Sequence, residues 1–416
     1  MRNIPGVSAL DRGEKGAGMV RSAARVGIAR RDFLRRTGIA VITVGATPSI
    51  LAACGGDEDT GASPAATGAG ASPEAPDASG TLNFLSWEGY DIPVDSMEAW
   101  RKDQGIEVKP TYIANHDEIQ AKIKGGGQAA GYDLITYYQG YMPLYTELEI
   151  LTPLDESKIP NLSELFPFWA SDESNFWINP EGERIGVPWT WGSIGLTYNS
   201  AEVDEMSSWY DLLDPSLTGK VATVDDPAGN FNLCCKILNL TSNEVPKDKL
   251  TEIVELMSQF VAQSRGVSPT FGDMTTKLVS GDAVACFHGW AAMNTFAADQ
   301  GVTTIKTNIP DEGSHSFCDS YAIPPTNQNP DAALAWMNQA LDPTVNAEAA
   351  EYLVGGVTVE ASVPLLNKAT KNLYPYEDLE ALLELAPLAI NAPTESGEFV
   401  TFPEWNEAFQ GIKAGA

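Results

Sequence analysis

Short apolar segments alternate with helix-forming segments from residue 81 onward, and this alternation limits the possible folds more than any other feature. Residues 81–85, 106–112 and 132–136 have the length and period of β-strands. Helices are predicted between them, at 97–104 and 116–124. Strand, helix, strand, helix, strand is typical of a mainly parallel sheet covered by helices. The sequence therefore predicts an α/β fold.

The same order returns later in the chain. A strand is predicted at 219–224, helices at 230–240 and 249–264, a strand at 283–287 and a helix at 331–341. Residues 81–416 number 336, which is more than one hydrophobic core usually accommodates. We therefore expect two lobes.

The start of the chain has the order of an export signal. Arg30 and Arg31 precede Phe33 and Leu34, and a mildly apolar run follows at 37–53. This run has only 17 residues and includes glycine and proline, whereas a spanning helix needs roughly 20 strongly apolar residues. Residues 1–53 are predicted to be a twin-arginine signal, not a permanent membrane span.

Cys54 follows Leu51 and two alanines, which resembles the site where bacterial lipoproteins are cut and acylated; the alternative is an ordinary buried cysteine. Each buried methylene of an acyl chain contributes about 0.8 kcal/mol to anchoring. Residues 55–80 consist almost wholly of Gly, Ala, Ser, Thr, Pro and acids and cannot bury a core. The sequence predicts a lipidated flexible tether at 54–80, which places the protein in the periplasm or on the cell surface. It leaves the membrane leaflet open.

The part after residue 53 is strongly acidic. It carries 53 acidic and 17 basic residues, a formal charge of −36. This charge argues against nucleic acid and anionic lipid as partners, because both would be repelled. Attraction of a cationic ligand and adaptation to salt explain the charge equally well.

Cysteine and histidine patterns exclude several kinds of site. Cys234, Cys235, Cys286 and Cys318 match neither a zinc nor a redox motif. Export permits a disulfide between Cys286 and Cys318, and two buried thiols are the alternative. No hydrolytic triad, H-E-x-x-H or Walker motif occurs in the sequence. We expect no metal, no cofactor and no catalytic residue.

Aromatic and acidic residues follow the predicted strands, where ligands of such sheets bind. Trp87, Tyr90 and Tyr138 follow first-lobe strands. After strand 219–224, Asp225 is expected to cap the following turn and Asp226 to face a cleft. In a strand near residue 319, Phe317 and Asp319 share one face. A buried aspartate is costly without a partner, so Asp319 is expected to face a ligand, with an internal salt bridge as the alternative.

Five segments of the chain carry a family resemblance: 84–90, 131–134, 187–199, 208–213 and 318–324. In them the chain resembles the spermidine and putrescine binding subunits of bacterial ABC importers, within the family 1 extracellular solute-binding proteins. Single segments are loose, but their order and spacing together are specific. The resemblance covers essentially residues 81–415.

The resemblance implies a two-lobed periplasmic-binding-protein fold of type II, with discontinuous lobes that close on ligand at a hinge. The expected division is 81–192 and 319–357 for lobe 1, and 193–318 and 358–416 for lobe 2. Crossover strands are expected near 191–196 and 317–322.

In that family, aromatic rings sandwich an aliphatic amine and carboxylates meet its ammonium groups. The positions that match are Trp87, Tyr90, Asp226, Trp290 and Asp319. Ring faces attract cations by roughly 0.5 to 2 kcal/mol each. For each aromatic residue, plain core packing is the alternative.

The sequence also departs from the family pattern. Gly229 stands where the spermidine binders often have a second acid, Gly356 where they have an aromatic residue, and Phe317 supplies the aromatic ring two residues before Asp319. Tyr138 replaces a small polar residue, and Glu88 or Glu360 are candidates for charge from another direction. The candidate ligand residues are therefore Trp87, Glu88, Tyr90, Tyr138, Asp226, Trp290, Phe317, Asp319 and Glu360.

The resemblance implies a monomeric, non-enzymatic receptor that delivers a small amine to a membrane permease with its ATPase. Another amine or cationic metabolite, a sugar, and ferric ion bound through Tyr137 and Tyr138 are the alternatives. An enzyme would have to use Asp226, His288 and Asp319 as acids and bases, but no nucleophile supports it.

Overall fold

The computed structural model describes residues 78–113, 116–170 and 176–415. The predicted signal, Cys54 and nearly all of the tether lie outside the described residues, so those expectations stay predictions. None of the helices among the described residues is both long and apolar enough to span a membrane.

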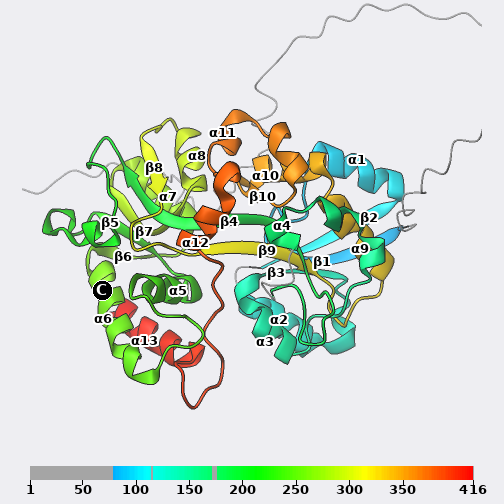
Figure 1. Cartoon of the computed structure of the whole chain (residues 1–416), viewed down its shortest axis with the longest axis horizontal. Coiled ribbons are helices and arrows are strands. Elements are labelled where there is room, and N and C mark those ends of the chain that lie inside the picture. Colours follow the sequence, from blue (N-terminus) through cyan, green and yellow to red (C-terminus); the bar gives the residue numbers. More distant parts are fainter. Residues whose placement is uncertain (1–77, 114–115, 171–175, 416) are drawn as a thin grey trace, which may run out of the picture. The chain divides into compact units, whose positions relative to one another are not determined.

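The first lobe is built on three parallel strands (Figure 1). Strand β1 (Gly80–Ser86) lies between β2 (Ile106–Tyr112) and β3 (Leu134–Tyr138). Helices α1 (Asp95–Gln104) and α2 (His116–Gly126) connect them. The predicted boundaries of these strands and helices agree with the observed ones within two residues. The largest difference in the strands is in β3, which starts two residues later than expected.

Asp133 lies immediately before β3 and joins distant segments of the chain. Its buried carboxylate accepts hydrogen bonds from the backbone of Asn83 at 2.8 Å, Gln328 at 2.7 Å and Asn329 at 3.1 Å. These bonds connect the segment before β3 with β1 and with residues 328–329.

The second lobe repeats the arrangement. Strand β5 (Val221–Val224) pairs in parallel with β6 (Ser264–Ser268) and β7 (Ala285–Trp290). Helix α5 (Pro227–Ile237) begins three residues before the predicted start, and α6 (Leu250–Ala262) follows it.

The remaining elements cover these strands or extend the sheet: α3 (Met142–Glu147), α4 (Pro167–Ala170), α7 (Phe271–Ser280), α8 (Ala292–Ala298), β8 (Ile305–Asn308), α9 (Pro330–Ala340), α10 (Pro343–Leu353), β10 (Gly356–Val357), α11 (Lys368–Lys371), α12 (Leu379–Leu385) and α13 (Phe402–Ala414).

Two long strands connect the lobes. Strand β4 (Val187–Asn199) is buried along its whole length; its first half pairs with β9 (Ser316–Ala322), and its second half pairs with β7 and β8. Strand β9 also pairs with β3 of the first lobe, through Tyr138 and Asp319. The strand order is β2-β1-β3-β9-β4-β7-β5-β6. The predicted crossover segments, 191–196 and 317–322, lie within β4 and β9.

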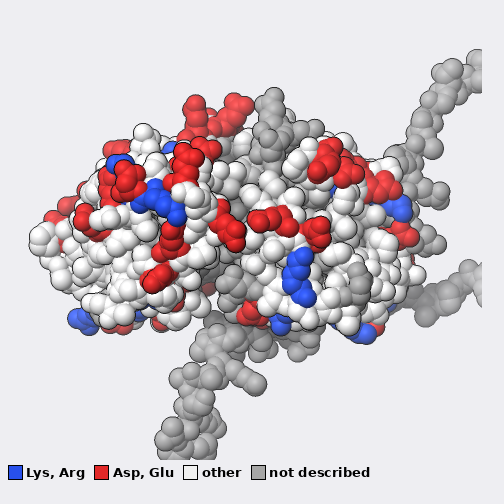
Figure 2. All heavy atoms as spheres, turned by 90° about the horizontal axis from the view of Figure 1, so that it is seen from below, with Lys and Arg blue, Asp and Glu red and all other residues white. Residues whose placement is uncertain are grey.

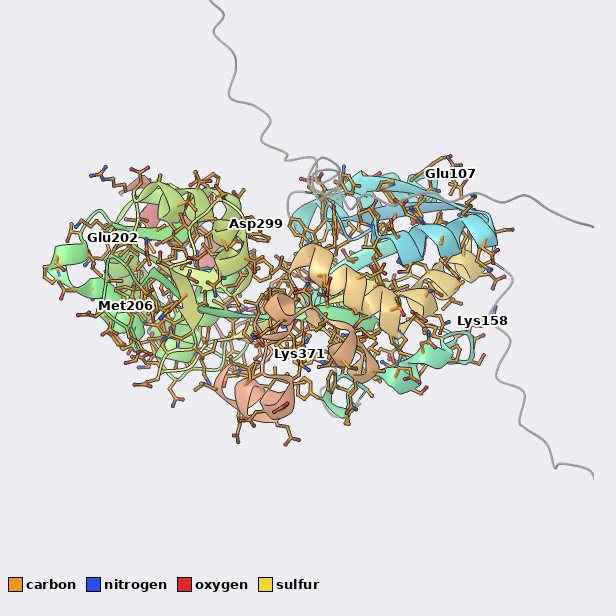
Figure 3. All side chains as sticks on the ribbon, turned by 90° about the horizontal axis from the view of Figure 1, so that it is seen from above. Glu107, Lys158, Glu202, Met206, Asp299 and Lys371 are labelled. Atoms are coloured by element: carbon orange, nitrogen blue, oxygen red, sulfur yellow. The ribbon has the colours of Figure 1, made fainter. Side chains whose placement is uncertain are left out.

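Each lobe has its own core. The first contains Phe84, Trp191 and Trp336, and the second contains Trp209, Phe260 and Trp405. In Figure 3 the labelled Lys158 lies among first-lobe elements and Glu202 among second-lobe elements. The acidic character continues on the surface, since Figure 2 shows acidic side chains spread across one face.

The segment that follows β10 packs with the first lobe. Val359, Tyr374, Leu379 and Leu388 belong to the same core cluster as Phe84. The sequence placed residues 358–416 in the second lobe as a whole. The exact lobe division stays a prediction, and this packing argues for moving 358–388 into the first lobe.

The four cysteines of the described part are free and buried, so Cys286 and Cys318 are two separate thiols in this structure. Burial raises the pKa of both thiols above their ordinary value. Of the two alternatives left open by the sequence, the structure has the pair of buried thiols.

Candidate functional site

Asp319 lies on crossover strand β9 and is 5% exposed. Its carboxylate accepts a hydrogen bond from the hydroxyl of Tyr90, and no described lysine, arginine or histidine pairs with it. Burial raises the pKa of Asp319 from its ordinary value to about 7, although the Tyr90 hydrogen bond acts in the opposite direction. The salt-bridge alternative is therefore not realised within the described residues.

Packing fixes the position of Tyr90 in the loop after β1. Its ring meets the edge of Trp189 at a centroid distance of 5.0 Å, and Trp189 stacks on Tyr321 at 4.8 Å. Tyr321 donates a hydrogen bond to the backbone oxygen of Tyr90 at 2.9 Å. The hydroxyl of Tyr90 is thus held against Asp319 by residues of β4 and β9.

Trp87 and Tyr138 both pack against one histidine. The His116 ring lies 5.5 Å from the Trp87 ring and 5.3 Å from the Tyr138 ring. Tyr141 packs on the same histidine at 4.4 Å. The structure brings Trp87 and Tyr138 into one aromatic group, in which the sequence had given His116 no role.

Asp226 begins helix α5 in the second lobe. It is the helix N-cap, because its Oδ1 accepts a hydrogen bond from the backbone of Gly229 at 3.1 Å. Asp225, the expected cap, instead pairs with Lys413 at 2.8 Å. That assignment was wrong: Asp226 has an extended backbone, from which its side chain reaches back to the first turn.

Asp226 is open enough to meet a ligand. Its side chain is 39% exposed, and its Oδ2 lies 3.7 Å from Nε2 of His288. Burial raises the pKa of Asp226, while the Gly229 hydrogen bond and His315 lower it. The cap and the candidate ligand contact use the two different oxygens of one carboxylate.

Trp290 and Phe317 are the aromatic candidates on the second-lobe side. Their rings lie 5.6 Å apart, at the end of β7 and the start of β9. A Cβ at Gly192 would lie 2.7 Å from the Phe317 ring and 3.4 Å from Trp290. Glycine at this position of β4 therefore makes room for both rings. The indole nitrogen of Trp290 is buried without a hydrogen-bond partner.

Tyr138 connects the aromatic group around His116 with the second lobe. Burial raises its pKa, and the charges of Tyr141, Asp226 and Asp319 act in the same direction. That hydroxyl donates to Asn391, which also accepts from Asn232 of α5 at 3.1 Å. A first-lobe strand and a second-lobe helix thus bind the same amide, beside a cavity of about 130 Å³ lined by Tyr141 and Asn391.

The two other predicted acids do not join these groups. Glu88 and Glu360 are exposed, and among the described residues no hydrogen bond or ion pair links them to Asp226 or Asp319. Their role in ligand binding stays a prediction.

The sequence pointed to His288 only as a possible acid or base of an enzyme, and it did not single out His315 or the asparagines around Asp226. His288 is 1% exposed and His315 is 7% exposed, with their rings 5.5 Å apart. Asn230, one helical turn after Asp226, bonds to His288 at 2.8 Å. The spacing of Asp226 and Asn230 on one helix face was an available signal, but the histidines become neighbours only through sheet pairing.

Two glycines depart from the family pattern, and in both cases another residue occupies the space that a side chain there would take. A Cβ at Gly229 would lie 2.2 Å from His288, and one at Gly356 would lie 2.5 Å from the indole of Trp191. The missing acid is therefore replaced in space by a histidine, and the missing aromatic side chain by a tryptophan.

The tyrosine pair does not fit an iron site. Tyr137 is fully buried and donates to the backbone of Phe176 at 3.2 Å, whereas Tyr138 on the opposite strand face bonds to Asn391. Within the described ranges, no group of three His, Cys, Asp or Glu side chains could hold a metal ion.

Relatives of known function match most of the chain. The spermidine/putrescine-binding periplasmic protein of Escherichia coli is 28% identical over 348 residues, which cover 82% of this chain and 93% of the relative.

Solved structures show the fold. The spermidine/putrescine ABC transporter substrate-binding protein PotD of Streptococcus pneumoniae has a TM-score of 0.65 at 22% identity, covering 81% of this chain and 99% of its own. The TpPotD lipoprotein of Treponema pallidum has a TM-score of 0.69 at 20% identity, covering 80% of this chain and 100% of its own. The predicted two-lobed periplasmic-binding-protein fold is confirmed.

The family model described as bacterial extracellular solute-binding protein matches residues 130–379, more than half of the chain. Together with the two-lobed fold, this match identifies the chain as a member of the bacterial extracellular solute-binding protein family.

Proposed function

We propose that this protein is the extracytoplasmic solute-binding subunit of an ABC importer and captures a small aliphatic amine of the putrescine and spermidine class between its lobes. The observation that carries the proposal is Asp319, a buried carboxylate on a crossover strand without a cation from the described residues. A buried charge needs a partner, and an ammonium group supplies both a charge and N–H donors. Relatives named as spermidine- and putrescine-binding periplasmic proteins support the same ligand class.

The surrounding rings suit such a ligand. Trp87, Tyr90, Trp290 and Phe317 offer apolar surface for methylene groups and ring faces for cations. Asp226 provides a second carboxylate in the other lobe. One ligand that contacts both carboxylates would therefore favour the closed arrangement of the lobes.

Thermal unfolding of the purified protein tests the ligand class. A ligand that binds the native state adds about 2.7 kcal/mol of stability at a hundredfold excess over its Kd. Putrescine and spermidine are expected to raise the melting temperature, whereas glucose and ferric citrate are not. A shift with sugar or iron and none with amines contradicts the proposal.

The family supports a transport role rather than catalysis. The ligand would be released to a permease whose separate ATPase supplies the energy. The receptor itself acts as a monomer and uses no cofactor. Incubation with putrescine followed by mass analysis should return unchanged amine, and any stoichiometric product would contradict the assignment.

Export by the twin-arginine route and anchoring through Cys54 complete the proposal. The sequence order of Arg30, Arg31, the apolar run and Cys54 supports it. Replacing both arginines by lysine should retain the protein in the cytoplasm, and Cys54→Ser should release it from the membrane fraction. Membrane retention of Cys54→Ser contradicts the anchor.

A further inference from the structure

The amide of Asn230 has only one chemically acceptable orientation. Its side chain is fully buried, and its Nδ2 donates to the backbone oxygen of Val224 at 2.8 Å. The opposite orientation would place two oxygens against each other. The Asn230 Oδ1 must therefore face Nδ1 of His288, which lies 2.8 Å away.

This orientation fixes the tautomer of His288. Because Oδ1 is only an acceptor, Nδ1 of His288 must carry the proton. Burial lowers the pKa of His288 to about 3, so the imidazole is neutral near pH 7. Its Nε2 is then a bare acceptor.

That acceptor faces another acceptor. Nε2 of His288 lies 3.7 Å from Oδ2 of Asp226, which is too long for a hydrogen bond between them even when Asp226 is protonated. No donor from the described residues bonds to Nε2. His288 also has φ 62, a strained conformation for a residue with a side chain. The fold therefore holds the His288 ring in place even though its backbone conformation costs conformational free energy.

We propose that Asp226 and His288 together bind the second hydrogen-bond-donating head of the ligand, with Nε2 of His288 replacing the acid absent at position 229. One ammonium nitrogen about 2.8 Å from each acceptor can donate to both across a 3.7 Å separation. The proposal deepens the proposed function and rests on it. It assigns His288 a direct ligand contact and Asn230 a positioning role.

The space around Gly229 agrees with a histidine that replaces the acid at this position. A Cβ there would lie 2.2 Å from Cε1 of His288 and 2.4 Å from Oδ2 of Asp226. Any side chain at 229 would therefore displace both acceptors. A ligand head that this pair selects carries at least two N–H donors, as a primary ammonium does.

Titration calorimetry of the full chain with putrescine and with propylamine tests the contact. Propylamine has one ammonium group and is expected to use Asp319. His288→Phe keeps an aromatic ring but places a C–H edge near the position of Nε2, which repels a cation because only ring faces attract it. Loss of one hydrogen bond to a charged group is expected to weaken putrescine about tenfold or more. Propylamine should change less than about twofold.

The outcomes separate the two proposals. If the unaltered protein binds neither amine, the proposed function and this inference both fail. If it binds putrescine but His288→Phe keeps the affinity, or weakens both amines equally, only the inference fails. Asp225→Asn removes a neighbouring charge that pairs with Lys413 and serves as the matched control, with both affinities unchanged.

A measurement on the unaltered protein covers the case in which the variant does not fold. Nitrogen-15 spectra of histidine-labelled protein should show His288 protonated at Nδ1 and bare at Nε2. Putrescine should shift the Nε2 resonance towards that of a hydrogen-bond acceptor and leave Nδ1 protonated. A proton on Nε2 in the empty protein, or an unshifted Nε2 resonance with bound putrescine, overturns the inference.

Discussion

The two candidate carboxylates are held in different ways. Asp319 is buried on a strand and receives one hydrogen bond from Tyr90, whereas Asp226 caps a helix and keeps 39% of its side chain exposed. A buried charge with one neutral partner is costly to form, and a capping charge is already stabilised by backbone N–H groups. A bound cation should therefore stabilise the carboxylate of Asp319 more than that of Asp226.

Asp319→Asn is expected to have the largest effect on this comparison. Losing the buried charge should weaken putrescine about 100-fold, which corresponds to roughly 2.7 kcal/mol. The empty variant should be at least as stable as the unaltered protein at pH 7, because ionising the buried carboxyl costs free energy. Calorimetry and thermal unfolding measure the two effects, and a normal affinity would remove Asp319 from the site.

Gly229→Ala tests the space beside Asp226. Its Cβ would lie 2.2 Å from His288, so overpacking should lower the free energy of unfolding by about 1–3 kcal/mol. Gly272 is a matched control near the start of α7, where a Cβ would lie 3.6 Å from its nearest neighbour. Gly272→Ala should be neutral or slightly stabilising in the same denaturant titration. Equal behaviour of the two variants would contradict the tight packing.

Acidification should weaken ligand binding through Asp319. Its folded pKa of about 7 exceeds the value of about 3.9 expected in the unfolded chain, so protonation neutralises it below pH 7. Putrescine affinity should fall about tenfold between pH 8 and pH 6.

The same group has the opposite effect on the empty protein. Its contribution to stability is fully present below about pH 3.9 and is lost as pH rises through about 7. The difference in unfolding free energy between the unaltered protein and Asp319→Asn should therefore change over this range. A difference that is independent of pH, together with pH-independent binding, contradicts the raised pKa.

Asp226→Asn should have a smaller effect than Asp319→Asn. The carboxylate is 39% exposed, so solvent screens its charge, and asparagine is an equally good helix cap. We expect putrescine to bind about fivefold more weakly, with an unchanged melting temperature of the empty protein. Asp225→Asn is the charge-matched control. A larger loss for Asp226 than for Asp319 would reverse the comparison.

Tyr138→Phe should have the smallest effect. It removes the hydroxyl that bonds to Asn391, a neutral contact worth about 0.5–1.5 kcal/mol, and keeps the ring against His116. A few-fold loss of affinity in calorimetry is expected, and a loss as large as that of Asp319→Asn would indicate a direct contact with the ligand.

The sequence predicted the regular elements well because local signals specify them. Strand β2 was placed at its observed bounds, and β1 within one residue at each end. Helix α5 begins three residues before its predicted start, and Asp226 rather than the expected Asp225 is its cap. Backbone conformation at Asp226 decides between them, and sequence does not reveal it.

The site was predicted in part for a related reason. Asp226, Trp290 and Asp319 follow or occupy strands that a pattern can find, whereas His288, His315 and Asn391 gained their places only when distant segments met. Burial also changes the acid–base chemistry, since it lowers the pKa of His288 to about 3 and raises the pKa of Asp319 to about 7.

The sequence by itself determined the α/β fold, the two lobes and the chain's resemblance to amine receptors, because strand and helix periods and short motifs are local properties. Only the tertiary structure decided which acid caps α5, which residues occupy the space at Gly229 and Gly356, and which nitrogen of His288 bears its proton. Those features depend on contacts between residues far apart in the chain, such as Asn230 with His288, and on the low-dielectric interior that sets their charge states.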